Sequence, residues 1–167
     1  MSEPPASHGP PGVRLRADIV DVYLFRVDGA GRPEFLQLRR TKRPMRGAWH
    51  PVMGHIRSGE TAIRCAVREV REEVGLDACS PDAVGLWQLE QVHPFFLAES
   101  DEIILSPRLA LRVSAGWTPT LNDEHDGARW TPLAEVNRAF CWPGQRECCR
   151  EIATEIVDRN AYTPLEI

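Results

Sequence analysis

"GHIRSGETAIRCAVREVREEVGL", residues 54 to 76, decides the fold of this chain. Apolar residues recur along it at helical spacing, and Gly75 stands where a helix C-terminal cap is expected. The stretch therefore predicts a helix over residues 60–74. One stripe of this helix is apolar and is expected to dock on the core; it consists of Ile63, Ala66, Val67, Val70 and Val74.

Three glutamates share another side of the same helix. At 100° per residue, Glu72 lies about 60° to one side of Glu69, and Glu73 lies about 40° to the other. Like charges at this spacing repel one another and destabilise a helix slightly. The apolar stripe is centred roughly 120° away, so we expect all three carboxylates to face outward. For three glutamates alone, a solvated acidic surface is the ordinary interpretation.

A basic segment leads into this acidic helix. No acidic residue occurs between Phe35 and Gly59, whereas that segment contains Arg39, Arg40, Lys42, Arg43, Arg46 and Arg57. Basic side chains suit phosphate groups, and carboxylates suit Mg²⁺ or Mn²⁺, which commonly share their coordination with substrate phosphates. The combination predicts metal-assisted attack at a phosphorus centre. Plain surface charge is an equally good interpretation of residues 39–46 taken singly.

These residues resemble a known family motif, the Nudix box, whose pattern is G-x5-E-x7-R-E-U-x-E-E-x-G-U with U an aliphatic residue. Every fixed position is filled, by Gly54, Glu60, Arg68, Glu69, Val70, Glu72, Glu73, Gly75 and Leu76. The resemblance implies an α/β fold, the Nudix α/β/α sandwich with a mixed β-sheet, over about residues 17 to 158. We expect residues 17–167 to form a single domain, and residues 1–16 to be a disordered tail.

The roles known for the family transfer to the matching positions. Glu69, Glu72 and Glu73 match the glutamates that hold Mg²⁺ or Mn²⁺, and Glu69 matches the one often named as the general base. Arg68 matches an arginine that orients a box glutamate. Gly54 matches a glycine whose carbonyl can reach the metal.

One more glutamate is a candidate outside the box. In some family members, a loop glutamate six residues before a tryptophan binds metal or serves as the base, and Glu124 stands six residues before Trp130. An acidic turn without function is the alternative interpretation. Glu60 matches a box position with a structural role. The rival loop carboxylates are Glu99, Asp101 and Glu102.

The resemblance also implies a reaction and a substrate class. Divalent cations neutralise a polyphosphate and acidify a water, a glutamate takes its proton, and the water attacks phosphorus in line. The flanking residues are similar to those of bacterial members that cleave nucleoside triphosphates or dihydroneopterin triphosphate and release pyrophosphate. We expect the substrate to contact Arg39, Arg40, Arg46 and Trp49. Alternatives are ADP-ribose, a dinucleoside polyphosphate, an RNA 5′ end, or a catalytically silent nucleotide-binding regulator.

The whole chain limits the other function classes. Its 167 residues suffice for one domain with a sizeable core, and its formal net charge of −4 argues against long nucleic acid or a membrane surface as partner. No apolar run approaches the roughly 20 residues of a spanning helix, and the N-terminus lacks the apolar stretch of a signal peptide. Five cysteines without a CxxC pair predict reduced thiols in a cytoplasmic protein. Because Nudix proteins often dimerise, a homodimer is one expected assembly.

Outside the helix at 60–74, the pattern predicts strands at 17–27, 34–40, 83–93 and 104–115, with a short strand within 47–59. Pro107 argues for an edge position or a bulge in the strand at 104–115. Two C-terminal helices are expected at 131–140 and 146–159. Four histidines are interpreted as structural or surface residues: His50, His55, His93 and His125.

Overall fold

The computed structural model describes residues 12–43 and 45–166, and its centre is a mixed β-sheet. Its strands lie side by side in the order β10 (His125–Pro132), β3 (Pro33–Arg40), β2 (Ile19–Val27), β9 (Arg108–Val113) and β6 (Ala83–Gln88). The short strands β4 (Trp49–His50) and β5 (Val52–His55) pair with β3 and β2, respectively. β2 and β9 are parallel, whereas the other pairs in this sheet are antiparallel.

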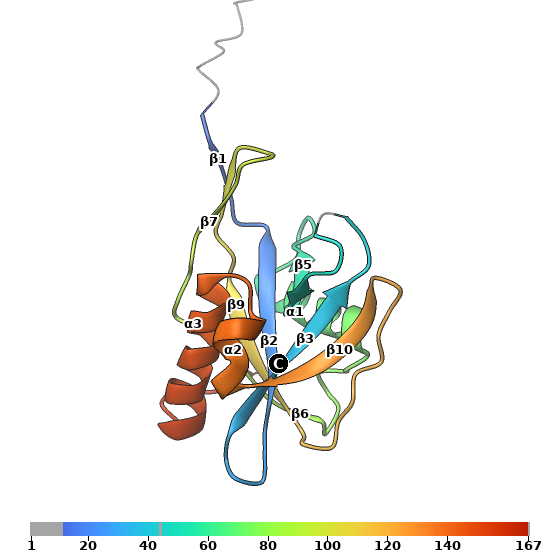
Figure 1. Cartoon of the computed structure of the whole chain (residues 1–167), viewed down its shortest axis with the longest axis vertical. Helices are drawn as coiled ribbons and strands as arrows, with labels where there is room; N and C mark the ends of the chain where they lie inside the picture. The colour runs from blue at the N-terminus through green and yellow to red at the C-terminus, as the bar shows by residue number, and fades with distance from the viewer. Residues whose placement is uncertain (1–11, 44, 167) are drawn as a thin grey trace, which may run out of the picture.

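Helices cover both faces of this sheet. Alternate residues of β2 enter two cores: Val22 packs with the helix α1 (Ala62–Val74), and Phe25 packs with the C-terminal helices. Those helices are α2 (Val136–Ala139), preceded by the 3-10 turn η1 (Leu133–Glu135), and α3 (Pro143–Glu151), which continues as the wider helix η2 (Ile152–Asp158). Figure 1 shows α2 and α3 on the near side of the sheet and α1 behind it. The predicted α/β/α sandwich is confirmed.

Both ends of the helix α1 are capped by residues of the types that favour helix ends. The hydroxyl of Thr61 accepts a hydrogen bond from the backbone N–H of Arg64, and Gly75 adopts the left-handed conformation with φ +71°. The prediction of this helix is confirmed, with one correction to its apolar stripe. Ile63 is 39% exposed, because it lines an outer groove together with Arg64 and Glu166 instead of reaching the sheet.

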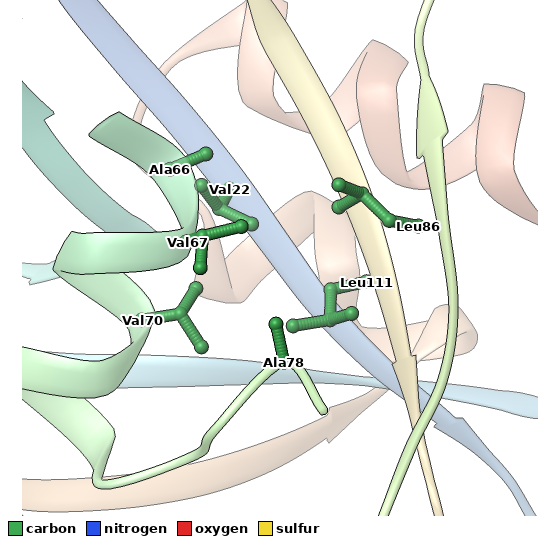
Figure 2. A pocket seen from close by; sticks show the side chains of 7 residues that line it. All are labelled: Val22, Ala66, Val67, Val70, Ala78, Leu86 and Leu111. Carbon is green, nitrogen blue, oxygen red and sulfur yellow. The ribbon is translucent and has the colours of Figure 1, made fainter. Parts of the chain in front are cut away.

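The apolar side of α1 packs closely on the sheet. In Figure 2, Ala66, Val67 and Val70 point from the helix toward Val22 and Leu111 of the central strands. The void that Leu86 and Ala78 also line measures only about 10 Å³, which is at the lower limit of the space that one water molecule needs. The position of α1 over the sheet is therefore fixed by close packing.

Truncating a side chain in this contact is expected to destabilise the fold. Leu86 is 2% exposed, so Leu86→Ala should lower the free energy of unfolding by about 2–5 kcal/mol. Val84 lies on the same strand but is 53% exposed, so Val84→Ala serves as the control with a change within about 0.5 kcal/mol. Urea unfolding monitored by circular dichroism measures both, and equal losses would contradict the packing described.

A second, smaller sheet projects from the body (Figure 1). It consists of β1 (Arg14–Arg16), β8 (Glu102–Ile104) and β7 (Phe95–Leu97), with β1 parallel to β8. The prediction of a tail is therefore wrong for residues 14–16, whose arginines pair with Glu102. Residues 1–11 of the predicted tail lie outside the described residues.

Two further predictions need correction. Pro107 lies between β8 and β9 and not within an edge strand, and β9 is an inner strand between β2 and β6. The helix predicted at 131–140 begins only at residue 133, because Thr131 and Pro132 pair with β3 at the end of β10. All five cysteines are free thiols. In the part of the chain that the structure describes, no helix has both the length and the apolarity to cross a membrane.

Candidate active site

The first box glutamate lies directly against a glycine of β5. A Cβ atom at Gly54 would lie 2.0 Å from Cδ of Glu69, so any larger residue there would displace this carboxylate. Gly54 pairs with Val20 of β2, which holds β5 against the sheet while α1 packs on β5 and β2. The missing side chain at residue 54 thus allows the carboxylate of Glu69 to approach the strand backbone.

Arg68 connects the box residues to one another. Its guanidinium donates two hydrogen bonds of 2.9 Å to the carboxylate of Glu60 and one of 3.0 Å to the carbonyl of His55. It also donates to Oε1 of Glu69 and, at 3.3 Å, to Oε2 of Glu72. Hydrogen bonds from Arg68 lower the pKa of Glu60 to about 2. Arg68 therefore orients Glu69 and fixes the segment that precedes α1 through Glu60.

The three box glutamates do not share one outward face, so that prediction is wrong. The side chain of Glu72 is 46% exposed, and its Oε2 forms an ion pair with Arg57 Nη2 at 3.5 Å. The side chain of Glu69 is only 13% exposed. Glu73 is buried at 4% exposure. Positions on a helical wheel do not show that the side of α1 that carries Glu73 is buried in the fold, where His125 Nε2 of β10 lies 3.9 Å from Glu73 Oε2.

Burial makes the carboxylate of Glu73 costly to ionise. Desolvation raises its pKa to about 9, and the negative charges of Glu69 and Glu124 add to the rise. Desolvation also raises the pKa of Glu69, against the effect of the hydrogen bond from Arg68. Two acidic groups that resist ionisation thus lie together beside β5.

Glu124 lies in the loop that leads into β10, and the structure brings it to the box glutamates. Its charge is one of those that raise the pKa of Glu73. Thr41 holds the loop, since its backbone N–H and its hydroxyl both donate to the carbonyl of Glu124 at 2.9 Å. The carboxylate is 43% exposed, with Lys42 Nζ at 3.6 Å. The alternative candidate Glu102 instead forms an ion pair with Arg16 in the small sheet.

The basic residues divide into two groups. Arg40 lies at the end of β3, opposite His125, and its positive charge lowers the pKa of Glu73. Arg39 is paired with Asp126 at 2.6 Å, and its guanidinium lies 5.7 Å from the ring of Trp49. Arg40 therefore faces the carboxylates, whereas Arg39 and Trp49 form a neighbouring surface.

Arg129 also covers the ring of Trp49, at 4.2 Å. Arg46 is exposed at the turn between β3 and β4.

The donor set fits a divalent cation on chemical grounds. Among the described residues, no three histidine, cysteine, aspartate or glutamate side chains are already arranged to hold a metal ion. Glu69 and Glu72 are instead paired with Arg68 and Arg57, respectively. However, Oε2 of Glu73 is enclosed without a hydrogen-bond partner. A buried carboxylate that has one unpartnered oxygen and is destabilised by like charges is stabilised by a cation.

Two histidines that the sequence analysis interprets as structural or surface residues lie near this carboxylate. The rings of His50 and His125 have centroids 5.2 Å apart, and both side chains are buried. Burial lowers the pKa of His125 to about 4, and the neighbouring His50 and Arg40 contribute to the fall. The only signal in the sequence is that His125 directly follows Glu124.

Known proteins resemble this chain in sequence and in fold. The family model described as "NUDIX domain" matches residues 15–152. The 8-oxo-dGDP phosphatase NUDT18 of Mus musculus is 32% identical over 142 residues, which are 77% of this chain and 42% of that protein. The Homo sapiens protein of the same description is 38% identical over 80 residues, 48% of this chain and 24% of that protein. The chain thus spans less than half the length of these relatives.

A solved structure supports the fold independently. The dihydroneopterin triphosphate pyrophosphohydrolase of E. coli superposes with a TM-score of 0.66 at 22% identity, covering 89% of this chain and 99% of that one. At this identity the likeness concerns the fold alone.

Proposed function

This chain belongs to the NUDIX domain family, and on that premise we propose that it is a divalent-cation-dependent hydrolase of phosphoanhydride bonds in nucleotides. The observation that carries the proposal is the carboxylate group around Glu73. Glu73 is buried, its Oε2 has no hydrogen-bond partner among the described residues, and the charges of Glu69 and Glu124 oppose its ionisation. This arrangement is costly to ionise without a counter-charge, and a cation bound beside Glu73 would supply that charge.

We assign Mg²⁺ or Mn²⁺ to Glu69, Glu72, Glu73 and Glu124, with the carbonyl of Gly54 as a further donor. When bound, the cation neutralises the polyphosphate and lowers the pKa of an adjacent water. Residues of this chain are proposed to accept the proton and to bind the substrate.

Glu69 is the proposed general base, and Glu124 is the second choice. The raised pKa of Glu69 makes it a stronger proton acceptor than an exposed carboxylate, and its hydrogen bond from Arg68 orients it. As Glu69 takes the proton, the water oxygen forms a bond to phosphorus and the P–O anhydride bond breaks. The electron pair leaves with the departing phosphate oxygen.

The basic residues are proposed to bind the substrate. Arg40 lies next to the carboxylates and is placed to contact the phosphates. Arg39 and Trp49 form the neighbouring surface, where Trp49 offers an aromatic ring for a base, and exposed Arg46 can extend the phosphate contacts.

We propose a nucleoside triphosphate or a pterin triphosphate as the substrate, with release of pyrophosphate. Residues flanking the box are similar to those of bacterial members with this activity. A nucleoside diphosphate is the second candidate, because relatives with 32% and 38% identity are described as 8-oxo-dGDP phosphatases.

A substrate panel tests the proposal. The full chain would be incubated in Mg²⁺ with ordinary and oxidised nucleoside tri- and diphosphates, dihydroneopterin triphosphate, ADP-ribose, a dinucleoside polyphosphate and a capped RNA end. Pyrophosphate and orthophosphate would be measured separately. Pyrophosphate from a triphosphate supports the first candidate, and orthophosphate from a diphosphate supports the second. Nucleotide binding without turnover on any substrate would instead identify a silent regulator.

A further inference from the structure

We infer that Arg57 binds the phosphates of the substrate, and that Glu72 holds its side chain aside until a divalent cation takes the place of Arg57 at Glu72. The inference rests on the proposed function, since it takes Glu72 as a ligand of the cation. It adds to the proposed substrate contacts an arginine from the loop between β5 and α1.

The backbone of residue 57 is fixed against the start of α1. Its N–H donates to Oε2 of Glu60 at 2.9 Å, and its carbonyl accepts the backbone N–H of Glu60 at 3.0 Å. Gly59 allows this turn by adopting the left-handed conformation, with φ +77°. Glu60 in turn accepts two hydrogen bonds from Arg68. The side chain of Arg57 therefore extends from a fixed point beside the box glutamates.

The side chain of Arg57, by contrast, is held at one point only. Its Nη2 lies 3.5 Å from Oε2 of Glu72, and its guanidinium has no further ion pair or hydrogen bond among the described residues. The two side chains are 63% and 46% exposed. An exposed ion pair of this length is weak in water. The guanidinium can therefore leave Glu72 at little cost.

The neighbouring Arg68 is not available for this role. Its side chain is 16% exposed, and all three of its nitrogens donate hydrogen bonds within the protein, to three glutamates and to the carbonyl of His55. Arg57 has donors to spare, and guanidinium donors form paired hydrogen bonds with phosphate oxygens. Arg57 is therefore suited to bind a ligand, whereas Arg68 is suited to hold the site together.

A cation at Glu72 reverses the preference of Arg57. Arg68 Nη1 donates both to Oε2 of Glu72, at 3.3 Å, and to Oε1 of Glu69, so these two carboxylates lie close together. With a divalent cation on them, Arg57 loses its partner oxygen and is repelled by the positive charge. Because Mg²⁺ and Mn²⁺ share their coordination with substrate phosphates, a phosphate is then the anion within reach of the guanidinium.

Metal affinity measured without substrate tests the first half of the inference. The full chain would be freed of metal by a chelator, dialysed and titrated with Mn²⁺, with free Mn²⁺ followed by its electron paramagnetic resonance signal. Arg57→Gln removes the charge that competes with the cation for Glu72, and is expected to tighten Mn²⁺ binding about two- to fivefold. Thermal unfolding checks the fold, which should persist because the backbone hydrogen bonds with Glu60 remain.

Steady-state kinetics in saturating Mg²⁺, with the best substrate of the panel, tests the second half. Arg57→Gln is expected to raise KM about tenfold and to change kcat by less than about twofold, because a phosphate contact is lost while the ligands of the cation remain. Arg57→Lys keeps a charged donor and is expected to recover most of this loss. Metal affinity and substrate affinity thus change in opposite directions, which a merely structural role of Arg57 would not produce.

Arg64→Gln is the matched control. Arg64 is an exposed arginine of α1 with no ion pair among the described residues, so its replacement removes the same charge from the same region. It should leave Mn²⁺ affinity and KM nearly unchanged. Wild-type KM or wild-type Mn²⁺ affinity in Arg57→Gln, or equal changes in Arg64→Gln, would overturn the role of Arg57 alone. Failure of the wild type to bind Mn²⁺ would contradict the proposed function itself.

Discussion

Replacing Glu72 with glutamine is expected to lower turnover by on the order of a hundredfold or more while leaving the fold intact. Glutamine has the shape of glutamate but offers only one oxygen and no negative charge to a cation. Glu72 is half-exposed, so the change leaves no buried group unpaired. Steady-state turnover in saturating Mg²⁺, with thermal unfolding to check the fold, measures the effect.

Glu147→Gln is the matched control for this prediction. Glu147 is also on a helix, is 49% exposed and pairs with an arginine, Arg150, but it lies on α3 and outside the site. Its replacement should leave turnover nearly unchanged. Near-normal activity in Glu72→Gln would contradict the assignment of Glu72 to the cation.

Glu73→Gln is expected to separate activity from stability. Activity should fall as far as in Glu72→Gln, because a ligand is lost. In the metal-free protein, however, the variant should be more stable than the wild type by on the order of 1–3 kcal/mol at pH 8. The reason is that burial opposes the charged form of Glu73, so the wild type must take up a proton at this residue when it folds at pH 8, whereas glutamine is neutral in both states.

The pH dependence of this difference has a definite sign. The pKa of Glu73 rises from 4.5 to about 9 on folding, so the folded state keeps a proton that the unfolded state has released. Wild-type stability therefore decreases as pH rises from about 4.5 to about 9, whereas glutamine contributes no such decrease. Urea unfolding of both proteins in chelator at several pH values measures the difference. A constant difference across this range would show that Glu73 is not buried as described.

The sequence predicts the fold well where local patterns determine structure. The period of the apolar residues and Gly75 predict α1, and alternating residues predict β2 and β3, because these signals depend on near neighbours. The predictions for residues 14–16 and 131–132 are wrong because these residues pair with strands that are distant in the sequence. β1 pairs with β8 from the other half of the chain, and β10 extends through Thr131 and Pro132, which directly precede the helical segment.

In the candidate site, too, the sequence predicts what depends on near neighbours and misses what depends on contacts between distant parts of the chain. Spacing alone brings Glu69, Glu72 and Glu73 to one region of the helix, but it does not show that Glu73 is buried. That burial arises only when α1 packs on β5 and β2, and the proximity of His125 arises only when β10 pairs with β3. No periodicity relates residue 73 to residue 125, so sequence analysis interprets the histidine as an ordinary one.

Turnover with and without divalent cation tests the central claim most directly, namely that the carboxylates on and beside α1 form a cation site for phosphoanhydride hydrolysis. The metal-free protein would be given the best substrate of the panel in chelator, and Mg²⁺ would then be added in steps. We predict no phosphate or pyrophosphate release before the addition, and a saturable rise after it that Glu72→Gln and Glu73→Gln lack. Undiminished turnover in chelator, or a response to Mg²⁺ in both variants equal to that of the wild type, would contradict the claim.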